Sequence, residues 1–153
     1  MKTSLTRSTY TELPTHPLSV SIARTYVARI LADWGRAELS DDAQLVVSEL
    51  LTNAIKATQA AHTPNDEEPM VHGKFAGYEC HPWIGLHQWG NDLVVEVWDC
   101  NHHPPKLRAP ESWEAGGRGL QVIDSLAVSW GYRWPKTGGK IVWATLAMSS
   151  SPA

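Results

Sequence analysis

One amphipathic helix constrains this chain more than any other stretch of its sequence. Between about residues 41 and 59 the apolar side chains recur every three or four positions and form one helical stripe: Ala43, Val46, Val47, Leu50, Leu51, Ala54 and Ala57. Ser40 is a candidate N-cap, and Asp41 and Asp42 suit the positive end of the helix dipole. A helix with a single apolar stripe buries it against another layer of structure.

A group of polar side chains borders this stripe. At about 100° per residue, Glu49, Asn53 and Lys56 fall within roughly 60° of one another on the helix surface. An amide can ligate a hard cation, a carboxylate can orient or deprotonate a nucleophile, and a lysine can bind phosphate. The other interpretation is a solvated helix edge with a Glu–Lys pair, and the helix alone does not decide between the two.

The remaining elements follow from periodicity and turn residues. We predict an edge strand at 4–13, a helix at 20–34, strands at 83–89 and 93–98, a helix at 119–126, and strands at 128–134 and 140–147. This order predicts the α+β class: a two-layer sandwich with a mixed, mostly antiparallel sheet and three helices on one face. We expect residues 1–153 to form one domain, with an irregular segment at 60–82 and a lid at 100–118.

Composition narrows the kind of protein that this chain can be. Hydrophobic residues make up 42%, charged residues 19%, and the net charge is −3, which is typical of a soluble globular protein. The chain has no basic stretch for nucleic acid, and its apolar runs are too short for a membrane span. Two cysteines, Cys80 and Cys100, are too few and too far apart to indicate a secreted disulfide framework. We therefore expect a cytoplasmic protein.

A structural zinc site is an alternative, because cysteines and histidines gather near the 83–98 hairpin and the lid. The spacing argues against it, since no Cys-x-x-Cys or His-x-x-x-His occurs and the adjacent His102 and His103 are poorly placed to share one ion. Hydrolase chemistry has less support, because the chain contains no Gly-x-Ser-x-Gly.

Several motifs together resemble a known family. They are VSELLTNA at 47–54, VEVWD at 95–99, GRGLQVI at 117–123 and a closing strand GGKIVW at 138–143. In this order they resemble the GHKL (Bergerat-fold) ATP-binding domain of gyrase-type ATPases, Hsp90 chaperones, sensor histidine kinases and mismatch-repair ATPases. The chain is most similar to the small bacterial anti-sigma-factor serine/threonine kinases and related ATP-binding regulators. The resemblance covers roughly residues 10–147.

The resemblance implies a role for each matching residue. Asn53 would ligate the Mg²⁺ that bridges the ATP phosphates, Glu49 would act as general base or water-orienting residue, and Asp99 would accept a hydrogen bond from the adenine amine. Lys56 would reach the phosphates. The turn that opens the last helix would hold phosphate, chiefly through backbone N–H groups, at Gly117, Arg118, Gly119 and Leu120.

Two positions after Asp99 depart from the family's pattern. Asn101 and His103 stand where the superfamily usually has glycine, so their side chains would stiffen the lid hinge or crowd the nucleotide. Two functions stay open. One is a kinase that passes the ATP γ-phosphate to a serine or threonine of an antagonist protein in trans, and the other is a pseudokinase that only binds proteins. The resemblance implies an antagonist protein or a sigma factor as partner, and a homodimer.

Overall fold

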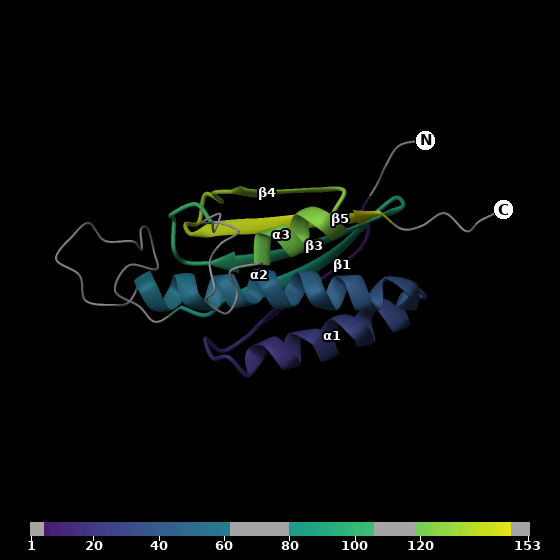
Figure 1. The fold of residues 1–153 in the computed structure, drawn as a ribbon, viewed down its shortest axis with the longest axis horizontal. Coiled ribbons are helices and arrows are strands. Elements are labelled where there is room, and N and C mark those ends of the chain that lie inside the picture. The colour runs from purple at the N-terminus through teal and green to yellow at the C-terminus, as the bar shows by residue number, and fades with distance from the viewer. Residues whose placement is uncertain (1–4, 62–79, 106–118, 148–153) are drawn as a thin grey trace.

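The computed structural model describes residues 5–61, 80–105 and 119–147 of the 153-residue chain. Within these ranges the strands form one layer and the α-helices a second layer (Figure 1). In chain order the elements are β1 (Leu5–Glu12), α1 (Ser19–Asp33), the short 3-10 helix η1 (Ala37–Leu39), α2 (Ser40–Ala61), β2 (Trp83–Trp89), β3 (Asp92–Asp99), α3 (Gly119–Leu126), β4 (Ser129–Arg133) and β5 (Lys140–Ala147).

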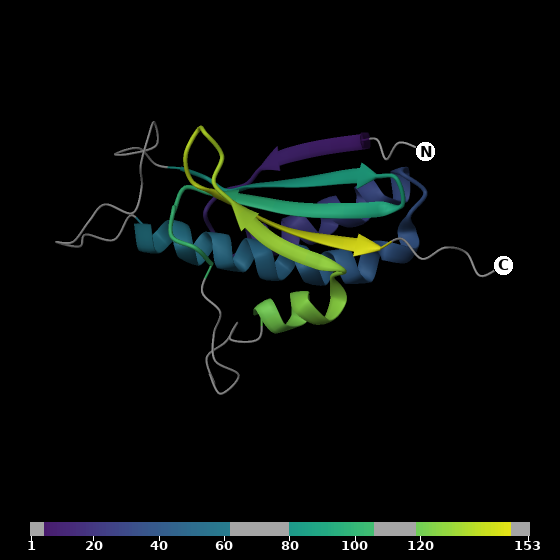
Figure 2. The same ribbon diagram turned by 90° about the horizontal axis from the view of Figure 1, so that it is seen from above.

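The sheet has the order β1-β2-β3-β5-β4, and its neighbouring strands pair antiparallel. Figure 2 shows the helices together on one face of this sheet. The predicted two-layer α+β fold is confirmed, and β1 lies at an edge as expected. The sheet was expected to be mixed, but every pairing in the described part of the chain is antiparallel.

The core lies between α2 and the middle of the sheet. Side chains alternate across a strand, so Leu93, Val95 and Val97 of β3 share one face, and each is at most 1% exposed. The predicted stripe of α2 supplies the opposite side of the core: Ala43, Val46, Val47, Leu50, Leu51 and Ala54 are all buried. Burying the stripe against β3 places the polar edge of α2 next to the end of that strand.

Ser40 is not the N-cap that the sequence predicted. It adopts helical angles, φ −58° and ψ −46°, and is itself the first residue of α2, because η1 leads directly into the longer helix. Its hydroxyl oxygen accepts a hydrogen bond from Gln44 Nε2 at 2.9 Å. The end of α1 agrees better with expectation, since Gly35 follows it with a φ of +69° that favours glycine.

On the face of the sheet away from the core, buried Glu96 ties three strands together. Its carboxylate accepts hydrogen bonds from His87 of β2 at 2.7 Å and from Arg133 of β4 at 2.9 Å. Burial by itself would raise the pKa of Glu96, but these hydrogen bonds and charges lower it below the usual value. The network links β3 to its neighbour β2 and, across β5, to β4 at the edge of the sheet.

Among the helices of the described ranges, none has the length and apolar character that crossing a membrane requires.

Candidate functional site

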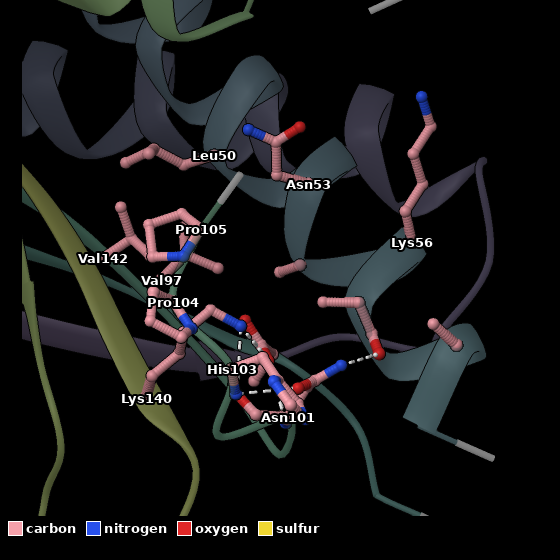
Figure 3. A pocket seen from close by; sticks show the side chains of 14 residues that line it. Leu50, Asn53, Lys56, Val97, Asn101, His103, Pro104, Pro105, Lys140 and Val142 are labelled. Atoms are coloured by element: carbon pink, nitrogen blue, oxygen red, sulfur yellow. Dashed lines mark hydrogen bonds and ion pairs between the residues drawn. The ribbon is translucent and has the colours of Figure 1, made fainter. Parts of the chain in front are cut away.

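A cavity of about 430 Å³ lies between α2, the ends of β3 and β5, and the chain that leaves β3 (Figure 3). Its volume is in the range of small-molecule sites. The residues that line it are Leu50, Asn53, Ala54, Lys56, Ala57, Ala60, Val97, Asp99, Asn101, His103, Pro104, Pro105, Lys140 and Val142. Most of these side chains are apolar, and the polar ones come from the edge of α2 and from the strand ends.

A buried ion pair lies at one end of the cavity. Lys140 Nζ donates to Asp99 Oδ1 at 2.9 Å and to the backbone oxygen of Asn101 at 3.0 Å. The side chains of Lys140 and Asp99 are only 3% and 2% exposed. Burial raises the pKa of Asp99 from 3.8 to about 6, and the adjacent ammonium limits this rise.

The two carboxylate oxygens of Asp99 differ in their hydrogen bonding. The backbone N–H of Asn101 donates to Oδ1 at 2.9 Å, and Lys140 donates to the same oxygen. No residue in the described part of the chain donates to Oδ2. The cavity therefore has a hydrogen-bond acceptor beside the Lys140 ammonium, in a lining that is mostly apolar.

Two glycines bring Lys140 opposite Asp99. Gly138 and Gly139 have φ angles of +104° and +73°, which other residues rarely adopt. A Cβ on Gly139 would lie 2.7 Å from Trp98 Nε1 and would also clash with the backbone oxygen of Asp99. The absence of this atom lets β5 start close to the end of β3, in a register that pairs Asp99 with Lys140.

The edge of α2 contributes two of the three polar residues predicted from the sequence. Asn53 and Lys56 line the cavity, and Lys56 extends away from Asn101 and Lys140 (Figure 3). Glu49 is half-buried one turn before Asn53 and is not among the described residues that line the cavity. Burial raises the pKa of Glu49, and the charge of Lys56 partly opposes the shift.

Asn101 and His103, which replace the expected glycines, both line the cavity. Asn101 is buried, and its Nδ2 donates to the backbone oxygen of Ala57 on α2 at 2.9 Å. Its Oδ1 accepts from the backbone N–H of His103 at 2.9 Å. The Asn101 side chain therefore connects the chain leaving β3 to α2, a link that glycine could not make.

Other predicted residues lie wholly or partly outside the described ranges. Gly117 and Arg118 lie outside them, and Gly119 and Leu120 are the first residues of α3, where the sequence predicted a helix to begin. Of the expected irregular segment and lid, residues 62–79 and 106–118 are likewise outside the description.

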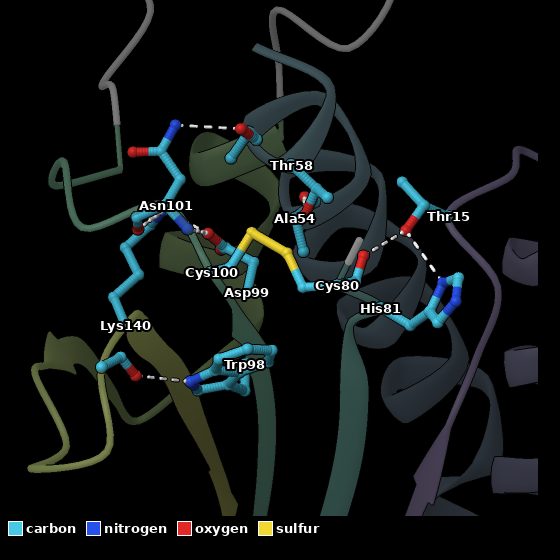
Figure 4. The surroundings of a disulfide bond; sticks show 12 residues. Thr15, Ala54, Thr58, Cys80, His81, Trp98, Asp99, Cys100, Asn101 and Lys140 are labelled. Carbon is cyan, nitrogen blue, oxygen red and sulfur yellow. Dashed lines mark hydrogen bonds and ion pairs between the residues drawn. A yellow bond between two sulfur atoms is a disulfide. The ribbon is translucent and has the colours of Figure 1, made fainter. Parts of the chain in front are cut away.

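Cys80 and Cys100 form a disulfide beside this site (Figure 4). This bond was not predicted, because the two cysteines are 20 positions apart and too few to indicate a disulfide framework. The β2–β3 hairpin between them brings their Cα atoms to 6.5 Å. Within the described residues, no group of three or more His, Cys, Asp or Glu side chains could hold a metal ion.

Lys140 is the site residue that sequence reasoning missed. The closing-strand motif contained it, but a lysine at a strand start is usually solvent-exposed. The only signal was its place after two glycines and before the apolar run Ile141-Val142-Trp143, which is unusual for a charged residue. Its partner became evident only with the β3–β5 register.

The arrangement suits a flat, amine-bearing ring in the apolar part of the cavity, with an anionic group toward Asn53 and Lys56. The comparison of sequences points the same way. A sequence profile of the histidine kinase-like ATPase domain matches residues 13–146. No curated protein sequence matches the chain.

Proposed function

Because the chain belongs to the histidine kinase-like ATPase domain family, within the GHKL superfamily, we propose that the cavity between α2 and the strand ends binds ATP with Mg²⁺. We further propose that the protein is an anti-sigma-factor-type serine/threonine kinase. It transfers the γ-phosphate of ATP to an antagonist protein in trans.

The observation that carries the proposal is the hydrogen bonding of the Asp99 carboxylate. Its Oδ2 is an acceptor without a donor in the described ranges, in a cavity that is otherwise largely apolar. The exocyclic amine of adenine is a donor on a flat apolar ring, so it would satisfy this oxygen while the ring packs against Val97 and Val142.

Asn53 fits a ligand of the Mg²⁺ that accompanies ATP. This cation prefers oxygen ligands and keeps several waters and substrate phosphate oxygens, so it needs few protein side chains. The Asn53 amide lines the cavity from α2, and Lys56 follows one turn later. Bound Mg²⁺ would neutralise charge on the phosphates, and the ammonium would add to this effect.

We infer that Glu49, which lies on α2 one turn before the cavity residue Asn53, acts as the base. In the transfer, the substrate hydroxyl gives its proton to the Glu49 carboxylate as its oxygen bonds to the γ-phosphorus. The bond from that phosphorus to the β–γ bridging oxygen breaks, and ADP leaves. The raised pKa of Glu49 makes it a stronger base than an exposed glutamate.

The partner of this reaction is proposed from family resemblance: an antagonist protein that accepts the phosphate, a sigma factor that the chain sequesters, and a second copy in a homodimer. The alternative is a pseudokinase regulator that only binds proteins. The hydrogen bonds of Asn101 to Ala57 and His103 favour it, because they stiffen a segment that glycines would leave flexible.

Calorimetric titration with a non-hydrolysable ATP analogue and Mg²⁺ tests the binding site. We expect Asn53→Ala to weaken binding about tenfold or more. Gln59→Ala is the matched control, because Gln59 is an exposed amide on the same helix outside the cavity lining. Equal affinities for the wild type and Asn53→Ala would overturn the assignment of Asn53.

Incubation with γ-³²P-ATP and an extract of the source cells tests the transfer. We expect the wild type to label a protein on serine or threonine, and Glu49→Ala to bind ATP but transfer no label. Transfer that persists in Glu49→Ala would contradict the role of Glu49. ATP binding without labelling by the wild type would favour the pseudokinase.

A further inference from the structure

We propose that Lys140 is a specificity-determining residue, which donates a hydrogen bond to the N1 atom of the bound purine. Together with Asp99 Oδ2 it would select 6-aminopurine over 6-oxopurine nucleotides. This inference rests on the proposed nucleotide site, and it assigns to the buried lysine a role beyond neutralising its partner.

Two of the three N–H donors of the Lys140 ammonium bind protein oxygens, which leaves the third for a ligand. An ammonium has three N–H donors. One goes to Asp99 Oδ1 and one to the backbone oxygen of Asn101, and the described residues accept no other hydrogen bond from this group. Lys140 also lines the cavity, so the remaining donor has a ligand-accessible space beside it.

The lysine is held in place more firmly than a surface lysine would be. Its side chain is only 3% exposed, and Figure 4 shows it reaching from β5 toward Asp99 and Asn101. Its backbone is fixed by the register with Asp99 and by the turn at Gly138 and Gly139. A donor fixed in this way is preorganised, so it can discriminate between ligands without an ordering cost at binding.

The free acceptor of Asp99 and the free donor of Lys140 match the base edge of adenine better than that of guanine. Asp99 offers one acceptor, Oδ2, and Lys140 beside it offers one donor. Adenine presents one such complementary pair, the N6 amine as donor and N1 as acceptor. Guanine presents O6 as acceptor but two adjacent donors, N1–H and the N2 amine, and the single open oxygen would leave one of them unpaired. A buried unpaired donor weakens binding, so this end of the cavity favours adenine.

The simpler role for Lys140 is that of a counter-ion that keeps Asp99 ionised. The two roles predict different results with 1-deaza-ATP, in which a C–H replaces N1 and the amine is retained. A counter-ion would not distinguish this analogue from ATP. A donor to N1 would, because the analogue leaves the ammonium hydrogen without an acceptor.

The experiment measures the affinities of the full chain for ATP, 1-deaza-ATP, purine riboside triphosphate and GTP by competition calorimetry. We expect the wild type to prefer ATP over 1-deaza-ATP by about 10- to 100-fold, the usual effect of a hydrogen bond to a charged group. Lys140→Met should abolish this preference. The matched control is Lys56→Met, which removes the other lysine of the cavity and should weaken both nucleotides alike.

Equal binding of ATP and 1-deaza-ATP by the wild type would overturn the inference. So would GTP binding as tight as that of ATP, or a preference that persists in Lys140→Met. If Lys140→Met does not fold, the wild-type ratios decide. Purine riboside triphosphate lacks the amine that Asp99 would bind. If the wild type binds this analogue more weakly than ATP but binds 1-deaza-ATP as tightly as ATP, the proposed function stands and only the role of Lys140 is wrong. No binding of any of these nucleotides would overturn both proposals.

Discussion

Replacing Lys140 by methionine should make the stability of the protein depend on pH in a new range. Methionine keeps most of the buried stem and removes the charge, so the packing changes little. The carboxyl of Asp99 then loses the ammonium 2.9 Å away that limits its pKa. In the variant this pKa should lie above the value of about 6 that it has in the wild type.

The direction of the effect follows from proton binding. In the unfolded chain Asp99 has a pKa near 3.8, whereas the folded wild type holds its proton up to about pH 6. A carboxyl pKa that is raised by folding favours the folded state at low pH. This contribution to the free energy of unfolding is lost as the pH rises from 3.8 to 6, and above pH 6 the free energy no longer changes on account of Asp99. In Lys140→Met the loss continues above pH 6, at up to about 1.4 kcal/mol per pH unit.

Urea unfolding at several pH values between 5 and 8 measures this difference. We expect the gap in unfolding free energy between wild type and Lys140→Met to widen above pH 6, reaching up to about 3 kcal/mol at pH 8. Lys136→Met, at an exposed lysine just before β5, should follow the wild type. Parallel profiles for Lys140→Met and the wild type from pH 6 to 8 would refute the coupling of Lys140 to Asp99.

Gly139→Ala should cost about 1–3 kcal/mol of stability from backbone strain, and more from contact with Trp98. Gly35→Ala has a similar φ but no atom within 4 Å of the new Cβ, so it should cost less, and equal losses in thermal unfolding would contradict the contact argument. Reducing the disulfide between Cys80 and Cys100 should lower the free energy of unfolding by about 3 kcal/mol, from the entropy of the opened loop. Unfolding curves with and without reductant measure this loss. The Cys80→Ala/Cys100→Ala double variant should give the same curve in both conditions. Wild-type curves that do not change, although the reduced thiols can be titrated, would contradict the prediction.

Local patterns were sufficient to predict the layers of this fold. The stripe of α2 and the alternation on β3 each have a period that sets which face is buried, and the structure joins those two faces. The cap at Ser40 was predicted wrongly because the preceding residues form a 3-10 turn that continues into α2. Such a turn has no strong sequence signal, so helix starts are predicted less well than helix faces.

The candidate site was predictable where one element carries the residues. Asn53 and Lys56 share a helix, and their spacing alone places them together. Lys140 and the Cys80–Cys100 bond depend on strands that meet only after the chain has folded back, which no local period encodes. Burial of a lysine is also the opposite of what its type predicts, and it is tolerated here because Asp99 supplies the opposite charge.

The disulfide limits the length to which the chain can be extended when its two ends are pulled apart. Cys80 and Cys100 are 20 positions apart, so the bond keeps the β2–β3 hairpin in a closed ring while the rest of the chain straightens. At full extension the oxidised chain is shorter than the reduced one by about 60 Å. Asp99 lies inside this ring and Lys140 outside it, so the ion pair at the end of the cavity joins a part of the chain that force cannot straighten to one that it can.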